Sequence, residues 1–238
     1  MTFAMPDRNI QILCTRPVDE SRIEEAKEKG IVLDVFSFIE TETIQTIEVQ
    51  QELEWASVQE ASVVFTSMNA VEAVTEMLDG HIPDWRIYCM GYKTKQLITA
   101  YFGESSISGT ADNADELAEE IIENEDPEEV IFFCGNQRRD ELPGKLDKHH
   151  IAVNEIVVYE TIAVEHTIEK EYDAVLFFSP SAVESFFKMN KLTAKPIVFA
   201  IGNTTAQTVS RFCSNKVIIS KLPGKDELVG QALEYFAK

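Results

Sequence analysis

Residues 63–72 of the chain read VVFTSMNAVE, and residues 175–184 read VLFFSPSAVE. The two stretches align at a shift of 177 − 65 = 112, and each places a serine between an apolar run and the sequence Ala-Val-Glu. The tripeptide DEL recurs at a similar shift, 226 − 115 = 111, between residues 115–117 and 226–228. Matches in register over this distance indicate a duplicated domain, because solenoid repeats have much shorter periods.

A second repeat has a different shift. Residues 31–41 align with residues 151–161, where Thr41 and Thr161 coincide at 161 − 41 = 120. Two shifts mean that the chain alternates between two types of segment. We name the segments A, B, A′ and B′, and they cover residues 10–41, 60–122, 130–161 and 172–236 in turn. The residues themselves leave open which A segment folds with which B segment.

Composition favours a globular protein, and the repeat sets the number of domains at two. The 238 residues supply roughly 110 for each domain, which is enough for an ordinary hydrophobic core. No apolar run approaches the roughly 20 residues that a membrane helix needs, and the N-terminus lacks the features of a signal peptide. We therefore expect a cytoplasmic protein with no membrane partner. The formal net charge of −20 also argues against a nucleic-acid partner, because such a surface repels polyanions.

The cysteines and histidines indicate no metal centre. Cys14, Cys89, Cys134 and Cys213 form no CxxC pair, and the first three lie in apolar stretches typical of buried free thiols. The four histidines lack the spacing of metal ligands. We expect neither a zinc nor a haem site, and no metal.

Alternating strands and helices predict the fold class. The strands are expected at residues 10–14, 31–39, 62–66, 86–90, 105–108, 130–134 and 151–159. The helices are expected at residues 19–29, 70–78, 94–102, 115–123 and 139–149, and segment B′ repeats segment B. Short connections between them require parallel sheets with helices on both faces. One A and one B segment supply about five strands, the size of a flavodoxin-like doubly wound domain, whose ligands bind at the carboxyl ends of the strands.

Ser67 and Ser179 each follow a strand end. The capping-box spacing from Asn69 to Glu72, repeated from Ser181, predicts that the helices begin at those positions. The two earlier serines then lie outside the helices, where a hydroxyl and free helix N–H groups can bind an anion. The alternative is that both serines only stabilise their turns.

Threonines follow the glycines that end two further strands. Thr94 comes three residues after Gly91, and Thr204 and Thr205 follow Gly202. Helix capping explains one threonine in each turn. The neighbouring pair also offers neutral hydrogen-bond donors to a carboxylate, whereas the sequence has no glycine-rich loop for phosphates.

Two more residues are candidates for chemistry. Arg138 leads from a strand end into a helix, where a guanidinium can bind a carboxylate or a phosphate, and a salt bridge to a nearby acid such as Asp140 is the alternative. Tyr159 ends an aliphatic strand, and its counterpart Ile39 has no phenol. A phenol there can donate a proton, although aromatic residues in strands usually serve packing.

Five short motifs carry a resemblance to a known family through their order and spacing. They are Val64-Phe65-Thr66-Ser67, Cys134-Gly135-Asn136, Val158-Tyr159-Glu160-Thr161, Phe177-Phe178-Ser179-Pro180-Ser181 and Ala200-Ile201-Gly202. Together they resemble uroporphyrinogen-III synthase over essentially the whole chain. The resemblance implies interleaved domains, with a two-stranded hinge that permits large domain motion. The implied domains are residues 1–37 with 164–238 and residues 42–158, and the implied connector strands are residues 38–41 and 159–163.

The resemblance also implies a reaction. Members of the family convert hydroxymethylbilane into uroporphyrinogen III without a cofactor, closing the ring while ring D is inverted through a spiro intermediate. By resemblance, Tyr159 assists departure of the substrate's hydroxyl. The residues expected to bind the substrate are Ser67, Thr94, Ser179, Thr204 and Thr205, together with Arg138 and Lys93.

The chain departs from the family pattern in segment B. Met68 stands where the family often has proline, and Tyr92-Lys93 replaces a smaller pair.

The alternative function is a non-catalytic, two-domain homologue that binds a small molecule or serves regulation. We expect the protein to be a monomer.

Overall fold

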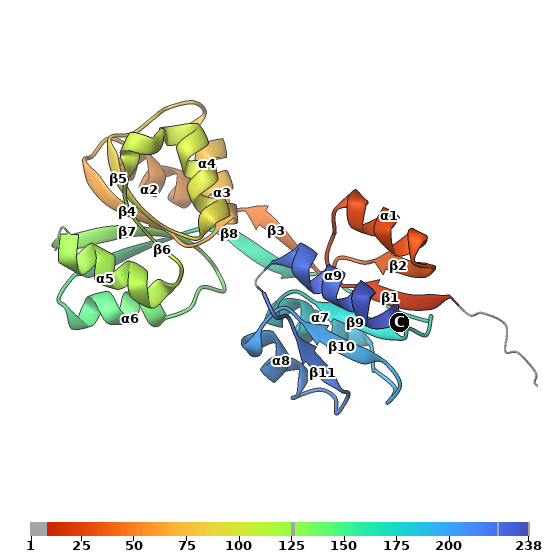
Figure 1. The fold of residues 1–238 in the computed structure, drawn as a ribbon. Helices are drawn as coiled ribbons and strands as arrows, with labels where there is room; N and C mark the ends of the chain where they lie inside the picture. The colour runs from red at the N-terminus through yellow and green to blue at the C-terminus, as the bar shows by residue number, and fades with distance from the viewer. Residues whose placement is uncertain (1–8, 125–126, 223, 238) are drawn as a thin grey trace, which may run out of the picture. The chain divides into compact units, whose positions relative to one another are not determined.

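The computed structural model describes residues 9–124, 127–222 and 224–237. Packing divides the chain into two units, one with the residues up to Glu40 and from Ile162 onward, and the other with Thr41–Thr161. The chain passes into the second unit in strand β3, Ile39–Thr43, and returns in strand β8, Ala152–Ala163 (Figure 1).

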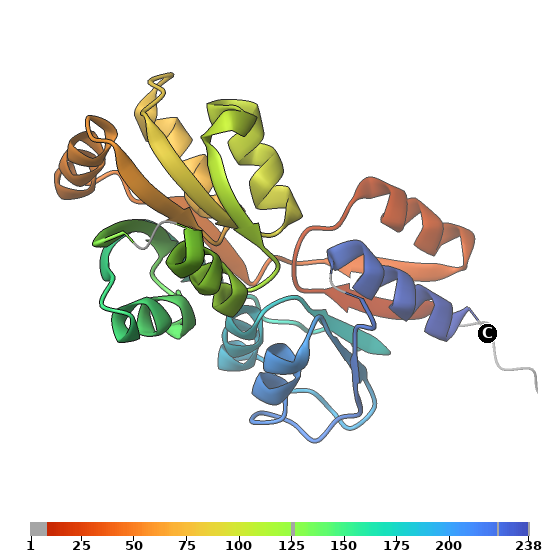
Figure 2. The same ribbon diagram turned by 60° about the vertical axis from the view of Figure 1, so that its left-hand side comes forward.

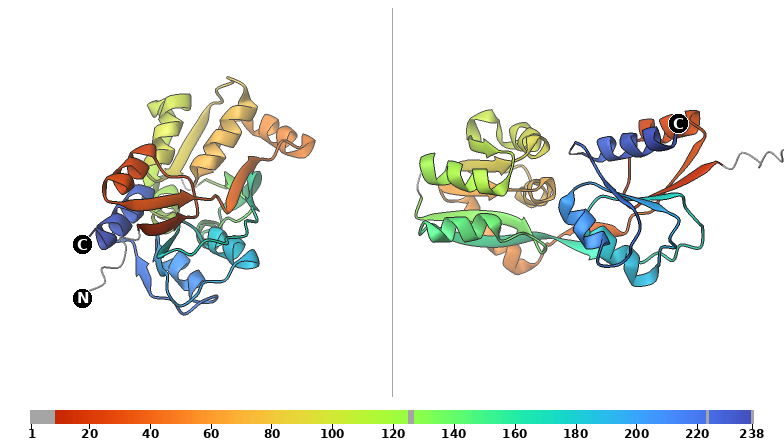
Figure 3. Two further views of the ribbon diagram at one scale, coloured as in Figure 1. Left: turned by 90° about the vertical axis from the view of Figure 1, so that its right-hand side faces the viewer. Right: turned by 60° about the horizontal axis from the view of Figure 1, so that its bottom comes forward.

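The first unit is a parallel sheet in the order β11-β10-β9-β1-β2, with helices on both faces (Figure 3). Its elements are β1 Ile10–Cys14, α1 Glu20–Glu28, β2 Ile31–Val35, β9 Ala174–Phe177, α7 Pro180–Met189, β10 Ile197–Ala200, α8 Asn203–Val209, β11 Val217–Ile219 and α9 Lys225–Phe236. This is the strand order of flavodoxin-like folds.

Strand side chains in the first unit alternate between the two faces of the sheet. Ile12 and Cys14 pack with α1 and α9, whereas Leu13 between them packs with α7 and α8. Helices α1 and α9 come from opposite ends of the chain and lie side by side (Figure 2). Burial on both faces explains why the strands read as continuous apolar runs.

The second unit contains a sheet in the order β3-β8-β7-β4-β5-β6. Its further elements are α2 Ile47–Ser57, β4 Ala61–Phe65, α3 Met68–Leu78, β5 Trp85–Met90, α4 Tyr92–Phe102, a 3-10 turn at Glu104–Ser106, β6 Ile107–Ala111, α5 Ala114–Asn124, β7 Glu129–Gly135 and α6 Glu141–Lys148. Val63 and Phe65 pack with α2, α3 and α4, and Val64 packs with α5 and α6. Segment A thus folds with B′ and segment B with A′, which confirms the predicted interleaved pair of flavodoxin-like sheets.

The strand predicted at residues 31–39 is wrong at its end. Strand β2 stops at Val35. The chain then bends at Phe38, whose side chain is buried in the core, and the Ser37 hydroxyl donates to the Ile39 carbonyl at 2.7 Å across the bend.

Helix α2 is absent from the predicted elements. It lies between segments A and B, where the repeat gives no template. Its apolar contacts come from Val49, Leu53 and Ala56, which are spaced as neighbours on one face of a helix. Thr46 caps this helix by accepting a hydrogen bond from the Val49 N–H at 3.4 Å.

Candidate functional site

A hollow of about 460 Å³ opens in the second unit, where strands β4, β5, β7 and β8 meet the first turns of α3, α5 and α6. Its lining includes Ser67, Arg138 and Tyr159, three of the residues predicted for the site. The remaining lining residues are Thr66, Met90, Asp112, Asn113, Ala114, Phe132, Gln137, Arg139, Glu141 and Leu142. Residues far apart in the sequence therefore meet at the strand-end edge where doubly wound domains bind ligands.

Ser67 is the N-cap of helix α3. Its backbone is extended, and its hydroxyl accepts a hydrogen bond from the Asn69 N–H at 3.2 Å. Ser179 does the same for α7, where it accepts from the Ala182 N–H at 3.1 Å. The predicted helix starts at Asn69 and Ser181 are therefore wrong. Each helix begins directly after its serine, because the strand turns into the helix at once.

The Tyr159 phenol reaches this capping serine. Its hydroxyl donates to Ser67 Oγ at 3.2 Å in a partly buried position. The ring lies against Gly135 at the end of the neighbouring strand β7, and a methyl group added there would overlap the Cζ atom of Tyr159. A side chain at this position would occupy the space of the phenol, so the glycine makes room for it.

Asn136 fixes the backbone around Tyr159. Its N–H donates to the Tyr159 carbonyl at 3.1 Å, and its side-chain oxygen accepts from the Thr161 N–H at 3.0 Å. The pairing of β7 with β8 shifts register between Cys134 and Gly135, which sets Gly135 opposite Tyr159. Irregularities of this type re-aim side chains at the ends of strands.

Arg138 is paired with acids of its own unit. Its Nε donates to the Glu155 carboxylate at 2.5 Å, and its Nη1 contacts the carboxylate of Asp140. The salt-bridge alternative is thus realised in the structure. Two carboxylates already balance the positive charge of this guanidinium.

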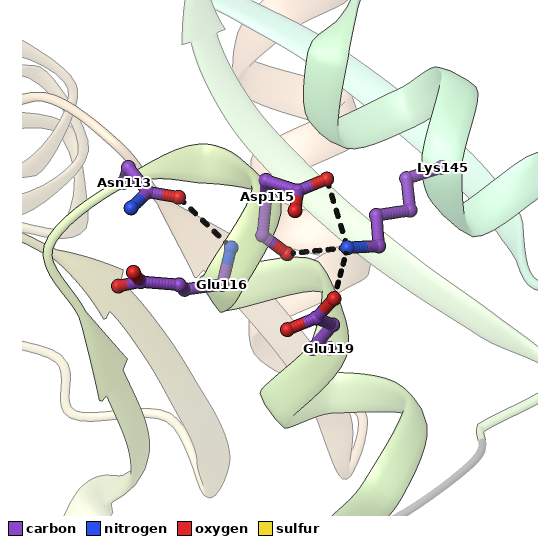
Figure 4. Close-up of polar contacts among 5 residues, drawn as sticks. All are labelled: Asn113, Asp115, Glu116, Glu119 and Lys145. Atoms are coloured by element: carbon purple, nitrogen blue, oxygen red, sulfur yellow. Dashed lines mark hydrogen bonds and ion pairs between the residues drawn. The ribbon is translucent and has the colours of Figure 1, made fainter.

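Lys145 joins helices α5 and α6, which contribute to the lining of the hollow (Figure 4). Its ammonium contacts the Asp115 carboxylate at 2.8 Å and the Glu119 carboxylate at 2.7 Å, and these contacts raise the pKa of Lys145. Asn113 caps α5, because its side chain accepts from the Glu116 N–H at 3.0 Å. The first turn of α5 is thereby held at the hollow.

Lys93 and Thr94 lie in the first turn of α4 and are not among the residues that line this hollow. The helix follows Gly91, whose φ of 86° favours glycine. Thr94 is 5% exposed, whereas Lys93 is an exposed residue. The structure therefore does not group these two residues with Ser67 and Tyr159 around the hollow.

Ser179, Thr204 and Thr205 lie in the first unit. They follow the neighbouring parallel strands β9 and β10, so they share one edge of that sheet. Helix α8 begins after Gly202. Thr205 is only 2% exposed, whereas Thr204 lies on the surface.

Within the described residues, no group of three or more His, Cys, Asp or Glu side chains could hold a metal ion. The same part of the chain has no helix that is both long and apolar enough to cross a membrane.

The model of the family described as uroporphyrinogen-III synthase HemD matches residues 21–230. The chain belongs to the uroporphyrinogen-III synthase family. This membership confirms the resemblance carried by the strand-end motifs. It also confirms the expected enzyme class, a cyclising lyase of haem biosynthesis.

Two solved structures share the fold of this uroporphyrinogen-III synthase family member. Uroporphyrinogen-III synthetase from Helicobacter pylori is 17% identical with a TM-score of 0.67, and the match covers 95% of this chain and 99% of that chain. A mutant uroporphyrinogen III synthase from Thermus thermophilus is 14% identical with a TM-score of 0.64, covering 95% of this chain and 97% of that chain. A comparison with curated proteins finds no match.

Gly135 and Asn136 belong to a motif that carries the resemblance, but the sequence analysis gave them no role in the site. The repeat contains a signal for them, because at the shift 135 − 15 = 120 they align with Thr15 and Arg16. The two copies thus differ at the position where the structure accommodates the Tyr159 ring.

Proposed function

We propose that this chain converts hydroxymethylbilane into uroporphyrinogen III, and that Tyr159 assists loss of the terminal hydroxyl. The observation that carries this proposal is the Tyr159 phenol, which lies against Gly135 and donates to Ser67 in the lining of the hollow. Family membership supports the reaction, and the geometry offers a proton donor within strand β8, opposite the end of β7.

The first step removes the terminal hydroxyl. Electrons of the terminal pyrrole expel the oxygen, the carbon–oxygen bond breaks, and a proton from the Tyr159 phenol turns the departing oxygen into water. The pyrrole then loses its N–H proton to solvent, which leaves a neutral azafulvene. A positioned phenol is among the side chains that can supply such a proton.

The second stage inverts ring D. The substituted carbon of ring D attacks the azafulvene, and the resulting spiro intermediate fragments and recloses in the inverted orientation. Spontaneous closure gives the uninverted isomer. The main task of the protein is therefore to hold the linear tetrapyrrole in the geometry that leads to inversion.

Strand-end turns would receive the acetate and propionate groups of the substrate. Hydroxyls and helix N–H groups can hold carboxylates in a protein of net charge −20, because oriented dipoles act locally. Lys93 adds a positive charge, whereas Arg138 contributes less because Glu155 and Asp140 balance it. The hydroxyl-bearing residues proposed for this binding are Ser67, Thr94, Ser179, Thr204 and Thr205.

The product isomer tests the proposal. Hydroxymethylbilane is supplied to the purified protein, and the products are oxidised and separated by chromatography. We expect the type III isomer in excess, with the type I isomer in a control without protein. Type I alone in both reactions would refute the proposal. Tight binding of hydroxymethylbilane without type III formation would instead identify a non-catalytic homologue.

We also propose that the protein is a cytoplasmic monomer that binds no nucleic acid. The net charge of −20 supports the exclusion of nucleic acid. Light scattering after size-exclusion chromatography should give a mass near 26.8 kDa, and twice that mass would contradict the monomer.

A further inference from the structure

The hydroxyl of Ser67 is used twice as an acceptor. It receives the Asn69 N–H at 3.2 Å and the Tyr159 hydroxyl at 3.2 Å. A serine hydroxyl has two acceptor lone pairs and one hydrogen. Both lone pairs are therefore engaged, and the hydrogen of Ser67 is left as its only remaining bonding capacity.

This arrangement defines what can happen when Tyr159 gives up its proton. A phenol has a single hydrogen, and in the structure that hydrogen is directed at Ser67. If the phenol hydrogen moves to another acceptor, no hydrogen remains between the phenol oxygen and Ser67 Oγ. The phenol oxygen is then an acceptor with no donor facing it from Ser67. The Ser67 hydrogen can then rotate about the Cβ–Oγ bond toward the phenol oxygen, while Ser67 still accepts the Asn69 N–H.

We propose that Ser67 is a positioning residue that acts through Tyr159, and this inference rests on the proposed function above. Before reaction, Ser67 accepts the phenol's hydrogen bond. As the carbon–oxygen bond of the substrate breaks, the Tyr159 proton passes to the departing oxygen to form water, and Ser67 donates its own hydrogen bond to the phenolate oxygen. The Ser67 proton stays on serine, so the step transfers one proton in total. A hydrogen bond to a charged partner is stronger than one between neutral groups, so Ser67 favours the charged state.

The duplicated turn supplies a comparison within the same molecule. Ser179 caps α7 as Ser67 caps α3, but its hydroxyl lies 3.1 Å from Ser181 Oγ rather than from a phenol. In the first unit, Thr15 stands where Gly135 stands in the second, and its hydroxyl donates to the Leu176 carbonyl at 2.8 Å. Capping a helix therefore does not require a phenol on the serine. The hydrogen bond between Tyr159 and Ser67 is an addition in one copy.

The test is a double-mutant cycle on the rate of type III formation, with Ser67→Ala, Tyr159→Phe and the double variant. If Ser67 acts through Tyr159, Ser67→Ala lowers kcat about tenfold, in addition to any rise in KM from its proposed part in substrate binding. In the Tyr159→Phe background, the same change should lower kcat less than twofold. Independent, multiplicative losses would overturn the proposal, as would a Ser67→Ala loss that appears in KM alone.

Two further variants separate this role from helix capping. Thr46→Ala removes the cap of α2 in the same unit, away from the hollow's lining, and should lower stability without changing kcat. Ser67→Thr keeps both the hydroxyl and the cap, and should restore kcat to within about threefold of the original protein. Failure of Ser67→Thr to restore kcat in a folded protein would count against the proposal.

A spectroscopic measurement makes the inference independent of the reaction. Tyrosine labelled with carbon-13 at Cζ reports on the hydrogen bond of each phenol, and Tyr159→Phe assigns the Tyr159 signal. The signal should shift in Ser67→Ala and remain in place in Thr46→Ala. An unshifted signal in Ser67→Ala overturns the inference even if the protein forms type III product. A protein that shows the shift but forms only type I would refute the proposed function instead.

Discussion

The Tyr159 hydroxyl donates to Ser67 Oγ at 3.2 Å, although the two residues are 92 positions apart in the chain. Ser67 caps a helix of segment B, and Tyr159 lies in the last strand of segment A′. The pair forms because strands β4, β7 and β8 are neighbours in one sheet. The interleaved fold thus creates a contact that neither copy of the repeat contains by itself.

Replacing Tyr159 with phenylalanine should lower the rate of type III formation by roughly 10²-fold, the lower end of what a positioned acid contributes. The ring can remain against Gly135, so the thermal midpoint should change little. Steady-state kinetics with product separation, together with a thermal melt, checks both expectations. An unchanged kcat would remove Tyr159 from the mechanism and leave the fold assignment intact.

Gly135→Ala should disturb the hydrogen bond between Tyr159 and Ser67 by displacing the Tyr159 ring. The new methyl group would overlap Tyr159 Cζ, so the ring must shift, which should weaken its hydrogen bond to Ser67. We expect a loss of about 1–3 kcal/mol in the free energy of unfolding, as for other overpacked sites. The rate should fall at least as far as in Tyr159→Phe. Denaturant unfolding and the product assay measure the two effects.

Gly144→Ala is the matched control for that substitution. Gly144 lies inside helix α6, and a methyl group there would meet no atom within 4 Å. Alanine favours a helix interior over glycine, so the variant should be more stable by about 0.5–1 kcal/mol and fully active. If both glycine variants lost activity equally, close packing against Tyr159 would not be the cause of the loss in Gly135→Ala.

The repeat predicted the fold because burial on both sheet faces leaves long apolar runs in the sequence. Phe65 and Phe177 keep such runs in register in both copies, and both side chains are fully buried. Helix α2 was not predictable in this way, because it lies outside the repeat. Only Leu53 and Ala56 of this helix are buried, so its apolar pattern is a weaker signal in the sequence than the continuous apolar run of a buried strand.

The site was predicted less completely than the fold. Ser67 and Tyr159 stand out as polar groups that follow apolar runs, so the sequence pointed to both. The predicted strand end at Tyr159 is wrong, because strand β8 continues to Ala163. Their contact depends on Gly135, whose role is visible only once β7 and β8 are paired with a register shift. The sequence named a nearby acid such as Asp140 as the alternative partner of Arg138, and the structure contains this ion pair. No pattern in the sequence indicates Glu155, 17 residues away, as the second partner.

The four thiols should differ in reactivity. Burial raises the pKa of Cys14, and it raises the pKa values of Cys89 and Cys134 to about 11. These three are at most 2% exposed, whereas Cys213 is partly exposed. Iodoacetamide at pH 8 should therefore label Cys213 first, since the thiolate is the reactive form. Mass spectrometry of the peptides checks the order, and urea should abolish the difference.

The same raised pKa values predict a loss of stability in alkali. A thiol whose folded pKa lies above its unfolded value of about 8.5 stabilises the fold fully below pH 8.5. That contribution is lost as the pH rises toward about 11. Cys89→Ser and Cys134→Ser test this. The original protein should be more stable than each variant at pH 8, and this gap in the free energy of unfolding should narrow by pH 10. A constant gap would show that ionisation of these thiols does not contribute.

Asp34 should make stability depend on pH at the acid end. Burial raises the pKa of Asp34, but hydrogen bonds from Lys170 Nζ at 2.5 Å and Tyr172 Oη at 2.8 Å outweigh it and hold the pKa below its usual value. A carboxylate with a lowered folded pKa stabilises the protein above its unfolded pKa of about 3.9. This contribution disappears as the pH falls through the folded value. Asp34→Asn should therefore cost about 1 kcal/mol at pH 7 and less at pH 3.

Urea unfolding of the original protein and Asp34→Asn at pH 7, 5 and 3 measures this difference directly. Tyr172→Phe is the companion variant, because it removes one of the two donors and leaves Lys170 in place. Its effect should also shrink as the pH falls through the folded pKa of Asp34, since the phenol then donates to a neutral acid. A cost of Asp34→Asn that is equal at all three pH values would show that charge on Asp34 is not what stabilises this contact.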